Sequence, residues 1–283
     1  MLAGLDRVAC AGEDDAALAA ARAPGVGLCT VVGIEGSFSR RLGAQVAVAP
    51  DGSTVGSLAD GCLEAQLASD IRKLQRPTVV RYGHGSPKID FRLPCGGGLD
   101  ILIDPTPNRS ACAEATAALA RREPARIALP AVSPLAERHY LPALRIVAFG
   151  EGPELEALSR LAAAMEIEID CFDKRRLTLG QAASGCRFDR WTAALLLFHD
   201  HEWELPLLEQ ALASEAFYIG AQGGENARIA RALELGARGV PEEEIAMIRS
   251  PVGLIPACKT PKSLALSALA EVVGQYERMN GGT

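Results

Sequence analysis

The segment Leu144–Arg175 constrains the fold more than any other part of the chain. It reads LRIVAFGEGPELEALSRLAAAMEIEIDCFDKR. A continuous apolar run is followed by a glycine turn, then by apolar residues at helical spacing, then by a second apolar run that ends in Asp173. This order predicts a strand, a helix and a parallel strand, which is the βαβ unit of a Rossmann-like sheet.

The glycine turn matches only part of the fingerprint of a dinucleotide-binding βαβ unit. Gly150 and Gly152 supply the first two glycines, but Leu155 stands where the third is expected. Asp173 lies near the place, roughly 20 residues further on, where such units carry the acid that binds ribose. The pattern is therefore compatible with a nucleotide site and with a purely structural βαβ unit.

Polar residues follow two later apolar runs. The run at 193–198 leads into His199-Asp200-His201-Glu202, and the run at 217–219 leads into the glycine-rich turn 220–224, before a predicted helix at 226–235. Open parallel sheets bind ligands at the carboxyl ends of their strands. We therefore expect His199 and Gly220 to line a ligand crevice, with backbone amides of the turn facing an anion. A metal shared by His199 and His201, two residues apart on an extended segment, is an alternative.

The amino-terminal half predicts a smaller domain of mixed structure. Its expected helices lie at 14–23, at 62–74 and shortly after Pro107, and its expected strands at 28–32, 45–49, 78–82 and 99–103. Prolines at 124, 130, 134 and 142 predict a weakly structured bridge. The chain is thus expected to be an α/β protein with two domains. A small mixed α/β domain occupies residues 1–142, and a Rossmann-like parallel-sheet domain occupies residues 143–283.

Composition excludes several classes of protein. The net charge of −6 over 283 residues argues against a nucleic-acid partner. The longest apolar run, Ala193–Phe198, is far too short to span a membrane. The amino terminus lacks the pattern of a signal peptide, so the eight cysteines predict reduced thiols and a cytoplasmic location rather than a disulfide framework.

Short motifs rich in glycine, arginine and cysteine recur in order along nearly the whole chain. They are Gly36-Ser37 with Arg40 and Gly43; Gly56-Ser57 with Gly61-Cys62 and Glu64; Cys95-Gly96-Gly97; Gly150; Asp173 with Arg175; His199–Glu202; Tyr218–Gly220; Arg249–Leu254; Lys259–Pro261; and Ala270-Glu271. Taken together, the set resembles the XdhC/CoxI family of accessory proteins for molybdenum hydroxylases such as xanthine dehydrogenase.

This resemblance implies a chaperone rather than an enzyme with turnover. Members of the family bind the molybdenum cofactor, protect it around its sulfuration by a cysteine desulfurase, and deliver it to an apo-hydroxylase. The cofactor, as molybdopterin or its cytosine dinucleotide form, is expected in a cleft between the domains. Its phosphate or nucleotide end should face the turns at Gly150 and Gly220. A homodimer is expected, with no nucleic-acid or membrane partner.

For a ligand of this kind, the main candidate site is the stretch Ile34–Leu67. Arg40 and Arg41 can clamp a phosphate. The amides of a glycine-serine nest can add donors. Cys62, at a helix start where a thiolate is favoured, is the candidate molybdenum contact or sulfur relay. The full candidate set for cofactor binding is Ser37, Arg40, Arg41, Gly56, Ser57, Gly61, Cys62, Glu64, Cys95, Gly96, Gly150, Gly152, Asp173, His199, Gly220 and Lys259.

Alternative interpretations of these residues remain open. Arg40-Arg41 fits a solvated turn, and Glu64 fits an acid in the first turn of a helix. Lys259-Thr260-Pro261 fits a helix entry with Thr260 as N-cap. For the whole protein, an NAD(P)-dependent oxidoreductase that uses Cys62 or His199, and a non-catalytic nucleotide sensor, are the alternatives.

Three positions depart from the family pattern. Asp60-Gly61 replaces a pair of glycines before the cysteine, Gln222–Glu225 replaces a Gly-Ser followed by basic residues, and Pro256 replaces a glycine. The first two substitutions introduce acids where an anionic ligand is expected, so they predict an altered ligand or partner.

Overall fold

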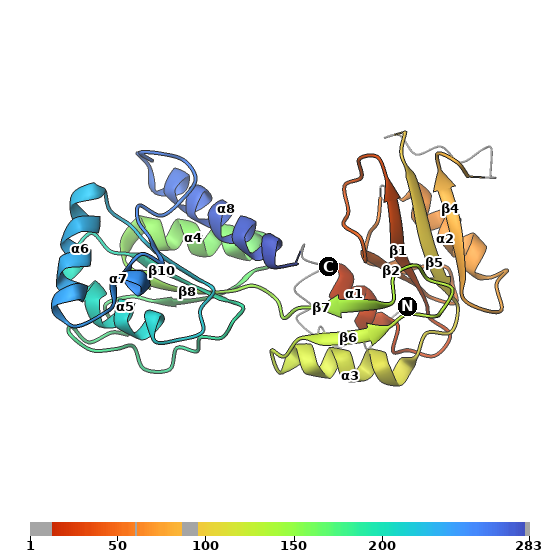
Figure 1. Ribbon diagram of the computed structural model, residues 1–283, viewed down its shortest axis with the longest axis horizontal. Coiled ribbons are helices and arrows are strands. Elements are labelled where there is room, and N and C mark those ends of the chain that lie inside the picture. Colours follow the sequence, from red (N-terminus) through yellow and green to blue (C-terminus); the bar gives the residue numbers. More distant parts are fainter. Residues whose placement is uncertain (1–12, 60, 87–95, 281–283) are drawn as a thin grey trace. The chain divides into compact units, whose positions relative to one another are not determined.

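The computed structural model describes residues 13–59, 61–86 and 96–280. The described chain divides between Ala143 and Leu144 into two compact units, which are treated separately below. Figure 1 shows the two units in sequence colours, the first from red to yellow and the second from green to blue. Among the residues so described, no helix is long and apolar enough to cross a membrane.

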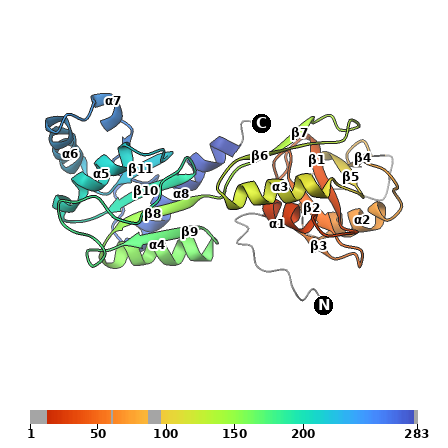
Figure 2. The same ribbon diagram turned by 90° about the horizontal axis from the view of Figure 1, so that it is seen from below.

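The amino-terminal unit is built on a five-stranded antiparallel sheet in the order β3-β2-β1-β5-β4. Its strands are β1 Gly27–Glu35, β2 Gln45–Val48, β3 Thr54–Val55, β4 Thr78–Gly83 and β5 Gly98–Asp104, and its helices are α1 Glu13–Ala20, α2 Cys62–Ile71 and α3 Arg109–Ala120. Alternation along β1 sends Cys29 and Val31 into a core with α2, and Leu28 into a core with α1 and α3. Helices α1 and α3 lie side by side (Figure 2).

The predicted weakly structured bridge is a β-hairpin, so that prediction is wrong. Strand β6, Ala125–Ala128, pairs with β7, Glu137–Tyr140, in antiparallel register. The prolines at 124, 130, 134 and 142 lie outside both strands, where no ladder hydrogen bond is lost. Two side chains tie the hairpin to the sheet, since Arg138 Nε donates to Gly43 O at 2.7 Å and Tyr140 Oη donates to Gln45 Oε1 at 2.7 Å.

The carboxy-terminal unit has the predicted parallel sheet, which confirms the fold class. Its order is β12-β11-β10-β8-β9, and every pairing is parallel. The strands are β8 Arg145–Gly150, β9 Glu168–Phe172, β10 Thr192–Leu197, β11 Tyr218–Ala221 and β12 Ile248–Arg249. The helices are α4 Gly152–Ala164, the 3-10 turn η1 His201–Trp203, α5 Glu204–Leu212, α6 Glu225–Ala237, α7 Glu242–Ile245 and α8 Pro261–Asn280.

Helices cover both faces of this sheet. Leucines of α4 pack with Ala268, Leu269 and Val272 of α8 on one face, and α5 with Leu235 of α6 covers the other (Figure 1). Helix α5 was not predicted. At the start of α8, Thr260 Oγ1 accepts from the amide of Ser263 at 3.1 Å, which confirms the helix-entry interpretation of that segment.

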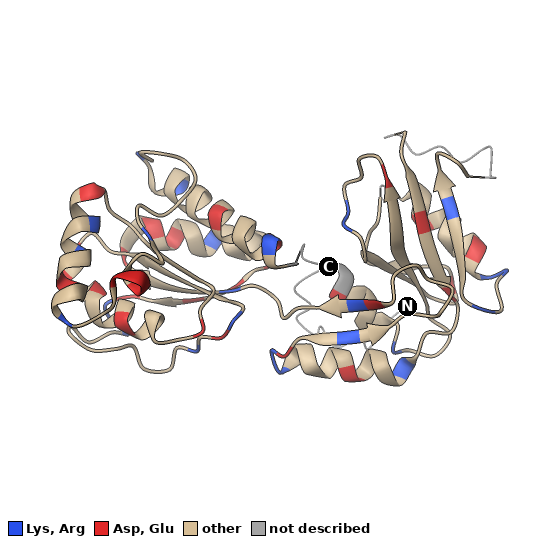
Figure 3. Ribbon diagram, viewed as in Figure 1, with Lys and Arg blue, Asp and Glu red and all other residues tan. Residues whose placement is uncertain are grey.

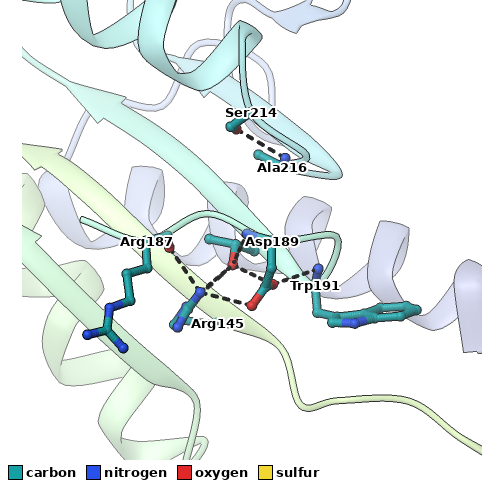
Figure 4. A network of polar contacts seen from close by, with 7 residues as sticks. Arg145, Arg187, Asp189, Trp191, Ser214 and Ala216 are labelled. Carbon is teal, nitrogen blue, oxygen red and sulfur yellow. Dashed lines mark hydrogen bonds and ion pairs between the residues drawn. The ribbon is translucent and has the colours of Figure 1, made fainter. Parts of the chain in front are cut away.

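Polar groups at the amino ends of β8 and β10 satisfy one another. Arg145 Nη2 donates to Asp189 Oδ2 at 3.0 Å and to the carbonyl of Arg187 at 2.9 Å. The other Asp189 oxygen accepts from the amide of Trp191 at 2.9 Å and from Thr192 Oγ1 at 2.8 Å (Figure 4). Both carboxylate oxygens are therefore used, and this edge of the sheet is closed by its own hydrogen bonds.

The strand order also defines where the sheet can hold a ligand. Chain connections leave β8 toward β9 on one side and return toward β10 on the other, so β8 and β10 flank the topological switch point. Open parallel sheets bind ligands at the carboxyl ends of such strands. Acidic and basic residues are interspersed along the ribbons of both units (Figure 3), so local contacts rather than a broad field decide the charge at this edge.

Candidate functional site

The first candidate site is the loop at residues 56–64, here named the Cys62 loop. Its backbone amides converge on one side chain, that of Glu64. Glu64 Oε1 accepts from the amides of Leu58 at 2.7 Å and Ala59 at 2.8 Å, and Oε2 accepts from the amide of Gly61 at 3.0 Å. The chain therefore supplies its own anion to the nest, and the Gly61 amide is not free for a phosphate in this form.

Glu64 is itself buried, with 6% of its surface exposed. Burial disfavours the charged carboxylate, but hydrogen bonds from the amides of Ala59, Leu58 and Gly61 outweigh that cost. They hold the pKa of Glu64 below its ordinary value of 4.5. The ionised side chain thus fastens the loop onto the first turn of α2. Glu64 therefore has a structural role, and it lies at a helix start as predicted.

Arg40 fastens the same loop from outside. Its Nε donates to the carbonyl of Ser57 at 3.1 Å, its Nη2 lies 3.3 Å from Ser57 Oγ, and that hydroxyl donates to the carbonyl of Ala59 at 3.0 Å. Arg40 and Arg41 are half-buried, while Ser37 is exposed. Gly56 and Gly61 have φ of 87° and 97°, so the loop requires glycine at both positions.

Cys62 is the first residue of α2, and its side chain is exposed. Other described cysteines differ: Cys29 and Cys112 are buried, and burial raises the pKa of both thiols. A Cβ added to Gly61 would meet no described atom within 4 Å. Gly96 is exposed at φ 69°, while Cys95 and Asp60 lie outside the described residues.

The second candidate site is the carboxyl edge of the parallel sheet. Two predicted turn glycines belong to strands instead, since Gly150 ends β8 and Gly220 lies within β11. A Cβ on Gly150 would stand 2.7 Å from the carbonyl oxygen of Leu197, and one on Gly220 would stand 2.7 Å from Tyr218 Cε1. Both glycines allow close packing within the sheet. Gly152 begins α4 at φ 73° and is the open glycine of the turn.

The charged residues at the end of β9 are paired with each other or across the edge. Asp173 Oδ2 accepts from Arg175 Nε at 2.9 Å and from Nη2 at 2.6 Å, and these bonds hold the pKa of Asp173 below its usual range. Lys174 Nζ lies 2.8 Å from Glu151 Oε1 and 3.3 Å from Asp200 Oδ2. The predicted ribose acid is thus engaged by its own neighbour.

The two histidines have different partners, which corrects the prediction that they lie on one extended segment. His201 opens the 3-10 turn, and its Nδ1 lies 3.1 Å from Glu204 Oε2. His199 Nε2 lies 3.4 Å from Glu154 Oε1, and its Nδ1 lies 3.4 Å from Gln222 Nε2. Within the described ranges, no group of three His, Cys, Asp or Glu residues could hold a metal ion.

Three buried oxygens at this edge accept no hydrogen bond from the residues that the structure describes. They are Glu154 Oε2, Glu204 Oε1 and Gln222 Oε1. Glu204 is 1% exposed and pairs through Oε2 with Arg231 at 2.8 Å. Arg231 Nη2 also donates to the carbonyl of Gln222 at 2.9 Å, so this ion pair holds the turn that carries Gln222.

Sequence reasoning missed Glu154, Glu204 and Arg231. Glu154 had a usable signal, because it follows the glycine turn in the first turn of a predicted helix. The pair Glu204–Arg231 had none, since its members come from separate helices that only the fold brings together. Lys259, which was predicted, is exposed beside the N-cap of α8.

Comparison with known proteins matches both units. Residues 146–272 match the model of the XdhC Rossmann domain, and residues 19–83 match the model of the XdhC and CoxI family. The chain is 33% identical over 267 residues to the molybdenum cofactor insertion chaperone PaoD of Escherichia coli K12, covering 88% of this chain and 82% of PaoD.

A crystal structure described as a xanthine dehydrogenase from Bacillus halodurans has the same fold. It superposes with a TM-score of 0.71 at 19% identity, over 94% of this chain and 96% of the other. The two family matches lie in the same order as the two units, and they include the Cys62 loop and the carboxyl edge of the sheet. This chain therefore belongs to the XdhC and CoxI family.

Proposed function

We propose that this protein is an insertion chaperone that binds the molybdenum cofactor and delivers it to a molybdenum hydroxylase of the xanthine dehydrogenase type. Membership of the XdhC and CoxI family and the likeness to PaoD support this function. The observation that carries it is the exposed Cys62 thiol on a loop fastened by Glu64. A cysteine desulfurase is the proposed second partner, because the delivered cofactor carries a sulfur ligand.

The chemistry of the Cys62 loop suits a soft metal better than a phosphate. A thiolate is a soft ligand of the kind that binds metals already coordinated by sulfur. The amides of Leu58, Ala59 and Gly61 are bound by Glu64, and Arg40 is engaged with Ser57. We therefore assign the Cys62 loop to the metal end of the cargo. The fixed loop would keep the thiol in place while the cargo is exchanged.

The alternative functions draw little support from the carboxyl edge. An NAD(P) enzyme needs a free acid for ribose and donors for pyrophosphate. Here Asp173 is bound to Arg175, and Glu151 and Glu154 lie at the glycine turn. A nucleotide sensor would need the same contacts.

The test compares Cys62→Ser with Cys258→Ser. Cys258 is a partly exposed cysteine in the other unit, whose thiol donates to the carbonyl of Ile255. Pterin content is measured by fluorescence after oxidation, and delivery by the activity of a reconstituted apo-hydroxylase. Cys62→Ser should keep the fold, since serine suits a helix start, but should lose most of the bound pterin or its delivery. Cys258→Ser should keep both. Loading and delivery at the wild-type level by Cys62→Ser would refute the role of this thiol.

A further inference from the structure

The carboxyl edge of the parallel sheet carries several carboxylates next to its turns. Four acidic side chains, Glu151, Glu154, Asp200 and Glu204, follow the switch strands β8 and β10. Lys174 is shared between Glu151 and Asp200. A phosphate brought to this edge would meet carboxylates at the turn where Rossmann-like sheets usually bind it, so electrostatic repulsion opposes such a ligand.

Glu154 has a carboxylate oxygen for which the described residues supply no hydrogen-bond donor. The residue is 9% exposed, and its Oε2 is buried without a hydrogen-bond partner among the described residues. A buried carboxylate oxygen without a donor costs free energy, so such atoms mark places where a ligand can supply one. A Cβ built on Gly152 would lie 3.9 Å from this oxygen, so the glycine keeps a side chain of residue 152 away from Oε2.

The His199 imidazole lies between Glu154 and a second acceptor, Gln222. Gln222 Nε2 faces His199 Nδ1, which leaves Gln222 Oε1 buried and without a described donor. His199 Nε2 faces Glu154 Oε1. The imidazole thus separates two side chains, each with one oxygen still to be satisfied. The buried pair Glu204–Arg231 fixes the backbone of Gln222 and so fixes the second acceptor.

We infer that the carboxyl edge binds the 2-amino-4-oxopyrimidine edge of a heterocycle, with Glu154 as the anchoring acceptor and Gln222 as the second, and that it does not bind a phosphate. Such an edge presents an exocyclic amine beside a ring N–H, which are adjacent donors for a carboxylate. Pterins and guanine share this edge. The assignment to the pterin of the molybdenum cofactor rests on the proposed function, but the donor preference does not.

The test is calorimetric titration of the full chain with free pterin, guanosine, cytidine and inorganic pyrophosphate. Wild type should bind pterin or guanosine. The compound that binds more tightly shows whether the recognised heterocycle is a pterin or a guanine. Cytidine should bind more weakly, because it lacks the adjacent ring N–H, and pyrophosphate should not bind. Glu154→Gln should weaken binding by at least about tenfold, the usual effect of losing a charged hydrogen bond.

Glu151→Gln is the matched control. It removes the same charge from the same turn, but Glu151 is engaged by Lys174, so affinity for pterin or guanosine should change less than about twofold. Thermal unfolding checks that both variants fold. Binding of pyrophosphate in place of the heterocycles, or equal affinity in Glu154→Gln and wild type, would overturn the inference. These readouts do not involve Cys62 or a hydroxylase, so they fail or succeed independently of the proposed function.

Discussion

The Cys62 loop and the carboxyl edge of the sheet differ in whether their polar groups have hydrogen-bond partners. In the loop, every amide named above already has Glu64 as its acceptor, and Arg40 already has Ser57. At the carboxyl edge, buried oxygens of Glu154, Glu204 and Gln222 lack a donor among the described residues. The loop, closed by its own hydrogen bonds, positions one exposed group, whereas the edge has buried acceptors that the ligand inferred above would satisfy with its donors.

The comparison is sharpest at Glu64, where removal should have the largest effect. Glu64→Ala leaves three loop amides without their acceptor, at sites that are partly or wholly buried. We expect a loss of about 3 kcal/mol in the free energy of unfolding, since each such donor costs roughly 1 kcal/mol or more. Denaturant unfolding measures it. Glu64→Gln keeps one acceptor oxygen and should lose less, and equal stability of both variants with wild type would show that the loop does not depend on Glu64.

Acid should weaken the same loop. The folded pKa of Glu64 lies below its ordinary value of 4.5, so its contribution to stability is present above that pH and is lost as the pH falls through the folded value. The difference in unfolding free energy between wild type and Glu64→Gln should therefore be constant near neutral pH and shrink below about pH 4.5. Unfolding of both proteins across pH 3–7 tests this, and a constant difference would contradict it.

A smaller effect is expected when the unsatisfied region loses its charge. Glu154→Gln removes a buried carboxylate with one unpartnered oxygen, so stability should stay within about 0.5 kcal/mol of wild type or rise. Asp189→Asn is the control, because both oxygens of Asp189 are hydrogen-bonded at the opposite edge of the same sheet. It should lose about 1–2 kcal/mol. A larger loss for Glu154→Gln than for Asp189→Asn would reverse the comparison.

The smallest effect concerns the predicted ribose acid. Asp173 is held by Arg175 on its own turn, so calorimetry with ADP should give the same result, no measurable binding, for wild type and Asp173→Ala. Arg175→Ala is the companion variant, because it frees the carboxylate. If Asp173→Ala alone weakens ADP binding, the acid reaches a ribose despite Arg175, and the carboxyl edge belongs with the nucleotide-binding sheets.

Much of the fold follows from local patterns in the sequence. The run from Leu144 to Arg175 determined a strand, a helix and a parallel strand, because apolar spacing and a glycine turn leave few other ways to bury the apolar residues. The prolines near residue 130 misled the prediction of the hairpin, since proline is compatible with turns between strands as well as with irregular chain. The exposed Cys62 at a helix start was also readable, because its glycine and its acid lie within three residues of it.

The roles of the surrounding groups depend on distances that the sequence does not contain. The glycines at 150 and 220 looked like turn residues but serve close packing against other strands and side chains, and the Gly61 amide, expected to face a phosphate, is bound by Glu64. Motifs and periodicity thus determined the family, the sheet and the position of the thiol. Only the tertiary structure decided which donors and acceptors remain unused, because hydrogen bonds saturate between groups that are far apart along the chain and adjacent in space.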